Sequence, residues 1–141
     1  MQSVIKFISI LLALIMSYFI VGNPEGFQPY VVETVTTQTT QITIIGENKT
    51  RNKIGDPRVE RIEKMVEKEW TLVGEPTDID SDYSTYNPLS TYKHILCFEE
   101  LSTGNKTLTE GEYRIVISYT LMTPKGNVEH IAYSCFTVFE V

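Results

Sequence analysis

Residues 113–141 carry the clearest hydrophobic pattern in the chain. From Tyr113 to Leu121 apolar side chains alternate with polar ones, and this period of two is typical of a half-buried antiparallel strand. Residues 123–126 (TPKG) predict a turn. In the stretch that follows, one parity holds most of the apolar residues: Ile131, Tyr133, Cys135, Phe139 and Val141. Phe136 and Val138 fall on the other parity. We therefore predict a long β-hairpin whose second strand is buried on both faces or carries a bulge.

The segment before this hairpin predicts a sandwich. Leu108, Gly111 and Tyr113 have the spacing of a tyrosine corner, in which the hydroxyl group turns back onto upstream backbone and braces two sheets. The alternative is an ordinary core tyrosine after an ordinary turn. Further strands are predicted at residues 40–45 and 92–98, with turn residues between them. About seven strands result, as in an immunoglobulin-like fold. The predicted fold class is an all-β, immunoglobulin-like antiparallel β-sandwich, preceded by an N-terminal hydrophobic helix.

Residues 58–73 are ambiguous. The apolar residues here fall at helical spacing with charges between them, which by itself favours an amphipathic helix: Val59, Ile62, Met65, Val66 and Trp70. The alternative is a β-hairpin with a turn at residues 67–69. In that interpretation Ile62, Lys64 and Val66 share one face, and Trp70 and Leu72 point inward.

The N-terminus predicts export. Lys6 precedes an almost wholly apolar run, and a break at residues 22–24 (GNP) follows it. This is the layout of a secretory signal peptide; retention of residues 4–21 as a membrane anchor is the alternative. The expected organisation is a signal peptide or anchor at 1–22, a spacer at 23–35 and the sandwich at 36–141. The protein is expected to be secreted or held at the cell surface, with membrane contact only through this segment.

Charge and cysteine content narrow the function. The formal net charge of −6 argues against nucleic acid as a partner. The chain has two cysteines, Cys97 and Cys135. In an exported protein they are candidates for a disulfide, with two buried free thiols as the alternative.

Candidate chemistry is sparse. Asp78, Asp80 and Asp82 resemble the start of a calcium loop but lack the later glycine and glutamate of an EF-hand, so they are a weak calcium candidate beside an ordinary acidic loop. His94 and His130 are too few for a zinc site. Glu99 and Glu100 are adjacent, so on a strand they would point to opposite faces. The sequence contains no nucleophile or phosphate-binding motif, and we expect no catalytic residue and no cofactor.

Three tyrosines and two sequons remain. Tyr83, Tyr86 and Tyr92 are candidates for a contact surface, or they cover the edge of the core. Asn48 and Asn105 each begin an Asn-Lys-Thr sequon. They would be glycosylated in a eukaryotic secretory route, or they serve as turn residues.

The order of several segments resembles a bacterial immunoglobulin-like domain found on exported proteins of Gram-positive bacteria. The resemblance spans roughly residues 36–141 and rests on these segments: TII at 43–45, NKT at 48–50, IEK at 62–64, EWTLV at 69–73, LTEGEYRIV at 108–116 and FEV at 139–141. It implies that residues 58–73 form a hairpin, and we adopt that prediction. Because the family has no common catalytic activity, it implies a structural or binding role at the cell surface with an unknown partner.

A second resemblance gives an alternative function. A G-x-Y strand followed by a late cysteine is similar to small exported lipid-binding sandwiches of the MD-2-related type. This resemblance implies a lipid or other ligand held between the sheets. The chain lacks the early cysteine pair of those domains.

Overall fold

The computed structural model describes residues 26–77 and 83–141. Its elements in chain order are β1 (Tyr30–Val31), β2 (Val35–Thr36), β3 (Gln41–Glu47), β4 (Lys53–Val66), β5 (Glu69–Gly74), β6 (Thr85–Tyr86), β7 (Thr91–Cys97), the 3₁₀ turn η1 (Phe98–Glu100), β8 (Gly111–Thr123) and β9 (Gly126–Phe139). The hydrophobic helix predicted within residues 1–22 lies outside the described residues. Within the two described ranges, no helix is long and apolar enough to cross a membrane.

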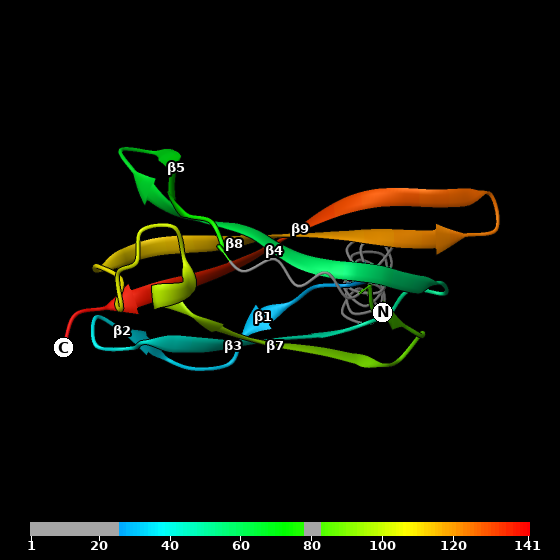
Figure 1. Cartoon of the computed structure of the whole chain (residues 1–141), viewed down its shortest axis with the longest axis horizontal. Helices are drawn as coiled ribbons and strands as arrows, with labels where there is room; N and C mark the ends of the chain where they lie inside the picture. Colours follow the sequence, from blue (N-terminus) through cyan, green and yellow to red (C-terminus); the bar gives the residue numbers. More distant parts are fainter. Residues whose placement is uncertain (1–25, 78–82) are drawn as a thin grey trace, which may run out of the picture.

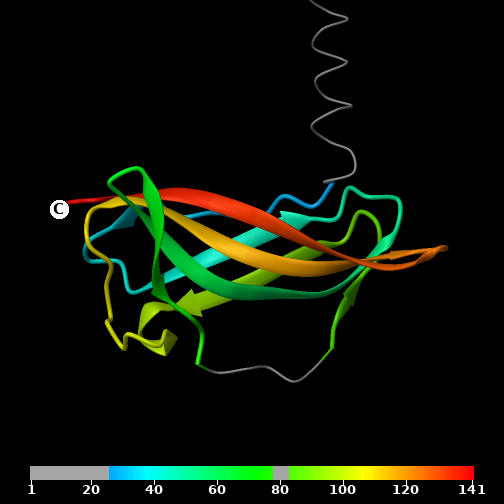
Figure 2. The same cartoon turned by 90° about the horizontal axis from the view of Figure 1, so that it is seen from above.

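Two sheets form a sandwich. Strands β1, β3 and β7 make the smaller sheet, and β2, β9, β8, β4 and β5 follow one another in the larger sheet, with β6 beside β4. Figure 1 shows β4, β8 and β9 in one layer above β3 and β7, and Figure 2 shows the same layers from above. The orders β1-β3-β7 and β9-β8-β4-β5 correspond to strands A-B-E and G-F-C-C′ of an immunoglobulin sandwich. The predicted all-β sandwich is confirmed, except that β2 pairs with β9 in parallel.

The hairpin of β8 and β9 is the longest pairing in the molecule. It runs without a register shift from Gly111 opposite Val138 to Thr123 opposite Gly126. The apolar parity of β8, from Tyr113 to Leu121, faces the core as predicted. In β9 the expectation is wrong, because the strand carries no bulge and is not buried on both faces. Its core-facing residues include Ala132, Ser134 and Val138, whereas Ile131 and Tyr133 are 53% and 42% exposed.

Residues 58–73 form the β4–β5 hairpin, so the helical spacing was misleading and the hairpin implied by the family resemblance is right. Glu67 and Lys68 make the turn with φ of 50° and 69°, as a two-residue hairpin turn requires. Register shifts occur in β4 between Gly55 and Arg58, between Val59 and Arg61, and between Ile62 and Glu63. Each extra residue shifts the alternation of faces. A strand with several shifts thus produces the three-residue apolar spacing of a helix.

The tyrosine corner is present. The Tyr113 hydroxyl donates a 2.6 Å hydrogen bond to the carbonyl of Thr109, and the ring stacks on Phe136 at 5.5 Å between centroids. Gly111 has a φ of 147°, and a Cβ there would lie 2.7 Å from Cε of Lys64. Lys64 in turn lies over the Tyr113 ring and donates to Oγ1 of Thr109. The glycine therefore lets the chain pass beneath this lysine into β8.

Side chains from both sheets fill the space between them. The fully buried residues include Ile42, Ile44 and Leu96 of the smaller sheet and Ile62, Ile115 and Ile117 of the larger one. Burying a side chain of this size stabilises a fold by about 1.5–3 kcal/mol. The core is thus the main stabilising feature of the sandwich.

Candidate functional site

The outward face of the larger sheet is the candidate site, and we call it the outer face. Because Tyr113, Ile115 and Ile117 point into the core, their neighbours in β8 point the other way. Register then places residues of β4 and β9 beside these outward side chains: Glu63 and Cys135 flank Arg114, and Arg61 and Tyr133 flank Val116. The outer face therefore combines charged, aromatic and aliphatic side chains from four strands.

A stack of rings around Arg114 organises one end of the outer face. The guanidinium carbon of Arg114 lies 4.5 Å from the ring centroid of Trp70 on β5 and 4.4 Å from that of Tyr133 on β9. These are cation–π distances. The arginine side chain is thereby held between two rings, which limits the conformations of all three residues.

The carboxylate of Glu63 holds the same arginine side chain in position. Its carboxylate accepts a 2.7 Å hydrogen bond from Nε of Arg114 and a 3.2 Å hydrogen bond from Nε of Arg61. Burial alone raises the pKa of Glu63, but the hydrogen bonds and charges of Arg114 and Arg61 outweigh it, so the pKa lies below the ordinary 4.5. Glu63 is therefore ionised at neutral pH.

Large apolar side chains around the stack are open to solvent. Ile131 and Leu72 are each 53% exposed, while Val116 is fully buried although it belongs to the outward parity of β8. Interfaces between proteins are enriched in aromatic residues and arginine and carry a polar rim. At the stack, the outer face shows this enrichment in aromatic residues and arginine.

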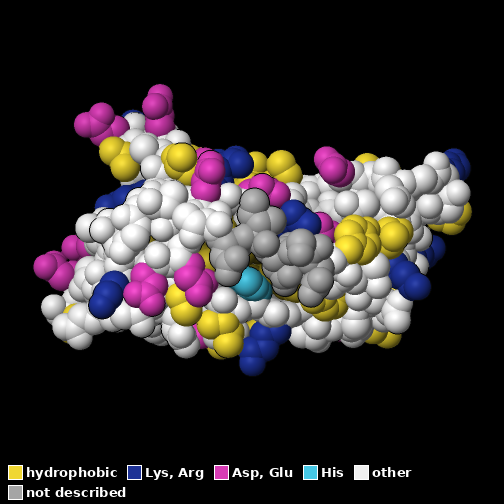
Figure 3. Space-filling view, in the orientation of Figure 1, with side chains coloured by type: hydrophobic (Ala, Val, Ile, Leu, Met, Phe, Trp, Pro, Cys, Tyr) yellow, Lys and Arg dark blue, Asp and Glu magenta, His cyan; other side chains and the backbone are white. Residues whose placement is uncertain are grey.

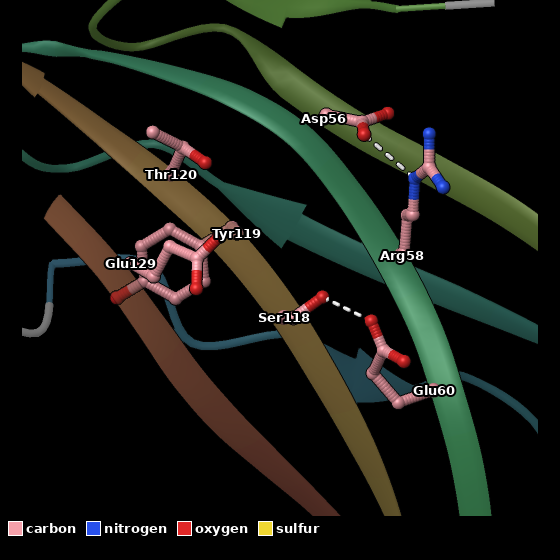
Figure 4. A pocket seen from close by; sticks show the side chains of 7 residues that line it. All are labelled: Asp56, Arg58, Glu60, Ser118, Tyr119, Thr120 and Glu129. Carbon is pink, nitrogen blue, oxygen red and sulfur yellow. Dashed lines mark hydrogen bonds and ion pairs between the residues drawn. The ribbon is translucent and has the colours of Figure 1, made fainter. Parts of the chain in front are cut away.

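A polar groove occupies the other end of the outer face. It has a volume of about 320 Å³ and is lined by Asp56, Arg58, Glu60, Ser118, Tyr119, Thr120 and Glu129. Figure 4 shows side chains of β4 and β8 meeting there: Ser118 Oγ donates to Glu60 Oε1 at 2.5 Å, and Arg58 Nε lies 2.6 Å from Asp56 Oδ2. Several of the charged groups are thus already paired. The groove supplies a polar rim beside the apolar stack.

The structure does not test the calcium candidates. Asp78, Asp80 and Asp82 lie outside the described residues. Among the residues that are described, no group of three or more acidic, histidine or cysteine side chains could hold a metal ion. His94 stacks on Tyr92, and His130 stacks on Tyr119 at 5.5 Å, so the histidines lie beside aromatic rings on different sheets. Glu99 and Glu100 are both exposed in η1.

Cys97 and Cys135 are free thiols in this structure, so the candidate disulfide between them is absent from it. Cys97 is half-buried on β7, with its sulfur 3.7 Å from Oε1 of Gln41. Cys135 is exposed on β9, opposite Arg114. The two residues belong to different sheets, and Cys135 lies on the outer face. The alternative of two buried thiols is therefore also wrong for Cys135.

The three candidate tyrosines are not one surface. Tyr92 is buried in the core, where it meets Phe27 and Tyr86 edge to face. Burial, together with the neighbouring Tyr86, raises the pKa of Tyr92. Tyr83 is 56% exposed, and its hydroxyl oxygen lies 2.2 Å from the position that a Cβ on Gly55 would take. Tyr83 alone is freely accessible, and the other two cover the edge of the core.

Asn48 has a structural role that its sequon concealed. Its side chain is fully buried, and Nδ2 donates to the carbonyls of Asn52 and Tyr86 at 2.9 and 3.0 Å. Oδ1 accepts from the backbone and the hydroxyl of Thr50. Both amide hydrogens, which are all that an asparagine offers, are thus in use. The folded chain cannot carry a glycan at Asn48, whereas Asn105 is exposed.

Comparisons with known proteins give a remote likeness. No family model and no curated protein matches the chain. Among solved structures, the chain is similar to the ASH / PapD-like domain of human CEP192 (PapD-like domain 7). The identity is 11%, the match covers 79% of this chain and 80% of that chain, and the TM-score is 0.38. We base the fold on the strand order of this chain and not on this likeness.

Proposed function

We propose that this chain is an exported, non-catalytic immunoglobulin-like module that binds a protein partner at the cell surface through its outer face. The apolar N-terminal run followed by Gly-Asn-Pro supports export. The observation that carries the binding role is the exposed apolar surface of Ile131, Leu72 and Tyr133 around the fixed Arg114.

The composition of the outer face favours a protein over a small molecule. Trp, Tyr and Arg are the residues that most often dominate binding energy between proteins, and here Trp70, Tyr133 and Arg114 lie in contact. Their mutual stacking reduces the side-chain entropy that binding would otherwise remove. Small-molecule sites are concave and mostly apolar, whereas the groove here is polar and the apolar part lies on a sheet surface. A lipid between the sheets is not favoured, because buried side chains of both sheets occupy that space.

Site-specific photo-crosslinking in the native host tests this function. A benzophenone amino acid replaces Ile131 on the outer face or, as a matched control, Ile95 on β7 of the smaller sheet, which is 49% exposed. We expect a crosslinked product of discrete mass from position 131 and none from position 95. A product of twice the chain mass would identify a second copy as the partner. Absence of a product at 131, or the same product from both positions, would overturn the proposal.

A further inference from the structure

One end of the sandwich is basic. The turn between β3 and β4 holds Lys49 and Arg51, β4 begins at Lys53, and the β8–β9 turn carries Lys125. Register brings the two turns to the same end, because Lys53 lies opposite Met122, next to the turn of the β8–β9 hairpin. All four side chains are exposed, and so is Glu47 at the end of β3, which leaves this end with a net of three positive charges. We call this set the basic pole, and Figure 3 shows Lys and Arg side chains gathered there, at the right.

The opposite end is acidic. It holds eight exposed glutamates against two exposed lysines, Lys68 and Lys106: Glu67, Glu69, Glu75, Glu99, Glu100, Glu110, Glu112 and Glu140. The 13 residues of β8 run from this end to the basic pole, a distance of roughly 40 Å at strand geometry. Charges are screened over about 8 Å at physiological ionic strength. The glutamates of the acidic end are therefore too distant to cancel the positive field at the basic pole.

An exposed leucine lies at the same end. Leu89 is 76% exposed, and its φ of 70° is in the left-handed region. Its backbone N–H donates to the carbonyl of Asn48 at 2.7 Å, next to Lys49. A bulky residue in this conformation costs of order 1–3 kcal/mol, and such strain is concentrated at functional sites. The fold thus holds an apolar side chain in solvent beside the basic pole.

The described chain also begins here. Gly26 accepts a 2.7 Å hydrogen bond from the backbone of Lys49, and Phe27 pairs with Asn48. Only residues 22–25 separate Gly26 from the apolar run that ends at Val21. Four extended residues span at most about 14 Å. An N-terminal segment held in a membrane would therefore keep the basic pole at the level of the lipid headgroups.

We infer that the basic pole docks on an anionic phospholipid surface. Lys49, Arg51, Lys53 and Lys125 face the headgroup phosphates, and Leu89 inserts at the boundary with the acyl chains, as apolar residues of peripheral proteins do. This role uses a different surface from the outer face. Docking at the pole leaves the outer face free for a protein partner.

Co-sedimentation with vesicles tests the inference. The protein is residues 23–141, which keep every core side chain from Phe27 to Val138 but lack the apolar run. Vesicles contain phosphatidylcholine alone or phosphatidylcholine with an equal part of phosphatidylglycerol. We expect binding to the anionic vesicles only, weakening as salt is raised. Equal binding to both compositions, or none to either, would overturn the inference.

Two charge-matched variants localise the contact. Each basic residue near an anionic surface contributes a factor of about five in partition. Lys49→Gln with Lys53→Gln should therefore lower binding about 25-fold. Lys68→Gln with Lys106→Gln changes the net charge equally at the acidic end and should leave binding unchanged. Equal losses in the two double variants would contradict a specific pole, provided that thermal unfolding shows both folded.

The apolar contact has its own variant. Leu89→Asn keeps a residue that tolerates positive φ and removes the apolar side chain. We expect weaker binding with an unchanged salt dependence, because the basic residues remain. Unaltered binding would remove Leu89 from the contact. Altered salt dependence would show that the variant disturbs the lysines.

Discussion

At each end of the sandwich, a different buried polar side chain fastens the strands to a neighbouring segment. At the basic pole, Asn48 joins the β3–β4 turn to β6 through hydrogen bonds to Asn52 and Tyr86. At the acidic end, the Tyr113 hydroxyl joins β8 to the preceding loop through the carbonyl and Oγ1 of Thr109, and the Tyr113 ring packs in the core. The Asn48 amide is neutral and all its groups are bonded, so its contribution to stability comes from hydrogen bonding alone. The tyrosine retains its packing even without its hydroxyl group.

The ends also differ in charge. Glu63, which pairs with Arg114 near the acidic end, is buried and ionised. The hydrogen bonds of Asn48 that fasten the basic pole involve neutral groups. We therefore expect the two ends to respond differently to mutation and to pH.

The largest effect is expected at the basic pole. Asn48→Ala removes the side-chain donor to the Tyr86 carbonyl and the acceptor of the Thr50 backbone N–H, whereas the Thr50 hydroxyl still donates to the Asn52 carbonyl at 2.8 Å. Each unsatisfied group costs about 1–3 kcal/mol. We expect a loss of about 3 kcal/mol in the free energy of unfolding, measured with urea. Asn105→Ala, the other sequon asparagine, should change stability by less than about 0.5 kcal/mol. Similar losses from both variants would show that the buried amide does not hold this end.

A smaller effect, dependent on pH, is expected at the acidic end. Glu63→Gln removes charged hydrogen bonds to Arg114 and Arg61 and should cost about 2 kcal/mol at pH 7. The folded pKa of Glu63 lies below 4.5, so the unfolded state binds the proton more readily. The contribution is complete above pH 4.5 and is lost as pH falls through the folded pKa.

Thermal unfolding from pH 7 downward checks this sign. The difference between wild type and Glu63→Gln should be constant above the ordinary pKa and shrink below it. The stability lost in Asn48→Ala should stay the same over this pH range. A deficit of Glu63→Gln that grows as pH falls would contradict the ionic account.

The next effect concerns the tyrosine corner. Tyr113→Phe removes the hydrogen bonds of the hydroxyl group to the Thr109 carbonyl and to Thr109 Oγ1 but keeps the ring, so we expect a loss of about 1 kcal/mol. The double variant Asn48→Ala with Tyr113→Phe should be additive within about 0.5 kcal/mol, because distant sites act independently. A double-mutant cycle in urea measures this. Strong coupling would mean that the two ends do not act separately.

The smallest effect is expected from Leu89, beside the basic pole. Leu89→Asn relieves part of the cost of a positive φ, and its side chain is 76% exposed, so little packing is lost. We expect a gain of about 0.5 kcal/mol in stability. Denaturant unfolding beside Leu89→Ala, which keeps the unfavourable φ, separates backbone strain from loss of the side chain. A loss of stability in Leu89→Asn would show that the leucine is stabilising in place.

Local patterns were enough to predict the β8–β9 hairpin and the Tyr113 corner. The apolar alternation in β8 is regular, and the partner of the Tyr113 hydroxyl is only four residues away. The β4–β5 hairpin was not accessible in the same way. Three register shifts in β4 disguise its alternation, and only the family resemblance gave the correct structure.

The candidate site could not be predicted, because it depends on contacts between strands. Arg114 and Trp70 are 44 positions apart in the sequence, and no local pattern shows that their side chains stack. The apolar parity of β9 favoured burial of Ile131 and Tyr133, but register with β8 turns them outward. For Asn48, the sequon suggested a turn residue, whereas its partners Tyr86 and Ser90 come from β6 and the turn after it, far along the chain.

The parallel pairing of β2 with β9 has a mechanical consequence. Val35 lies opposite Val138 and Thr36 opposite Phe139, and Thr37 donates to the Phe139 carbonyl at 2.9 Å. When two strands run in the same direction, tension applied before the first and after the second slides them along each other and loads all their hydrogen bonds together. Pulling Gly26 away from Val141 would load the β2–β9 pair in this way. The short β2 strand therefore acts as a shear clamp between the two ends of the domain.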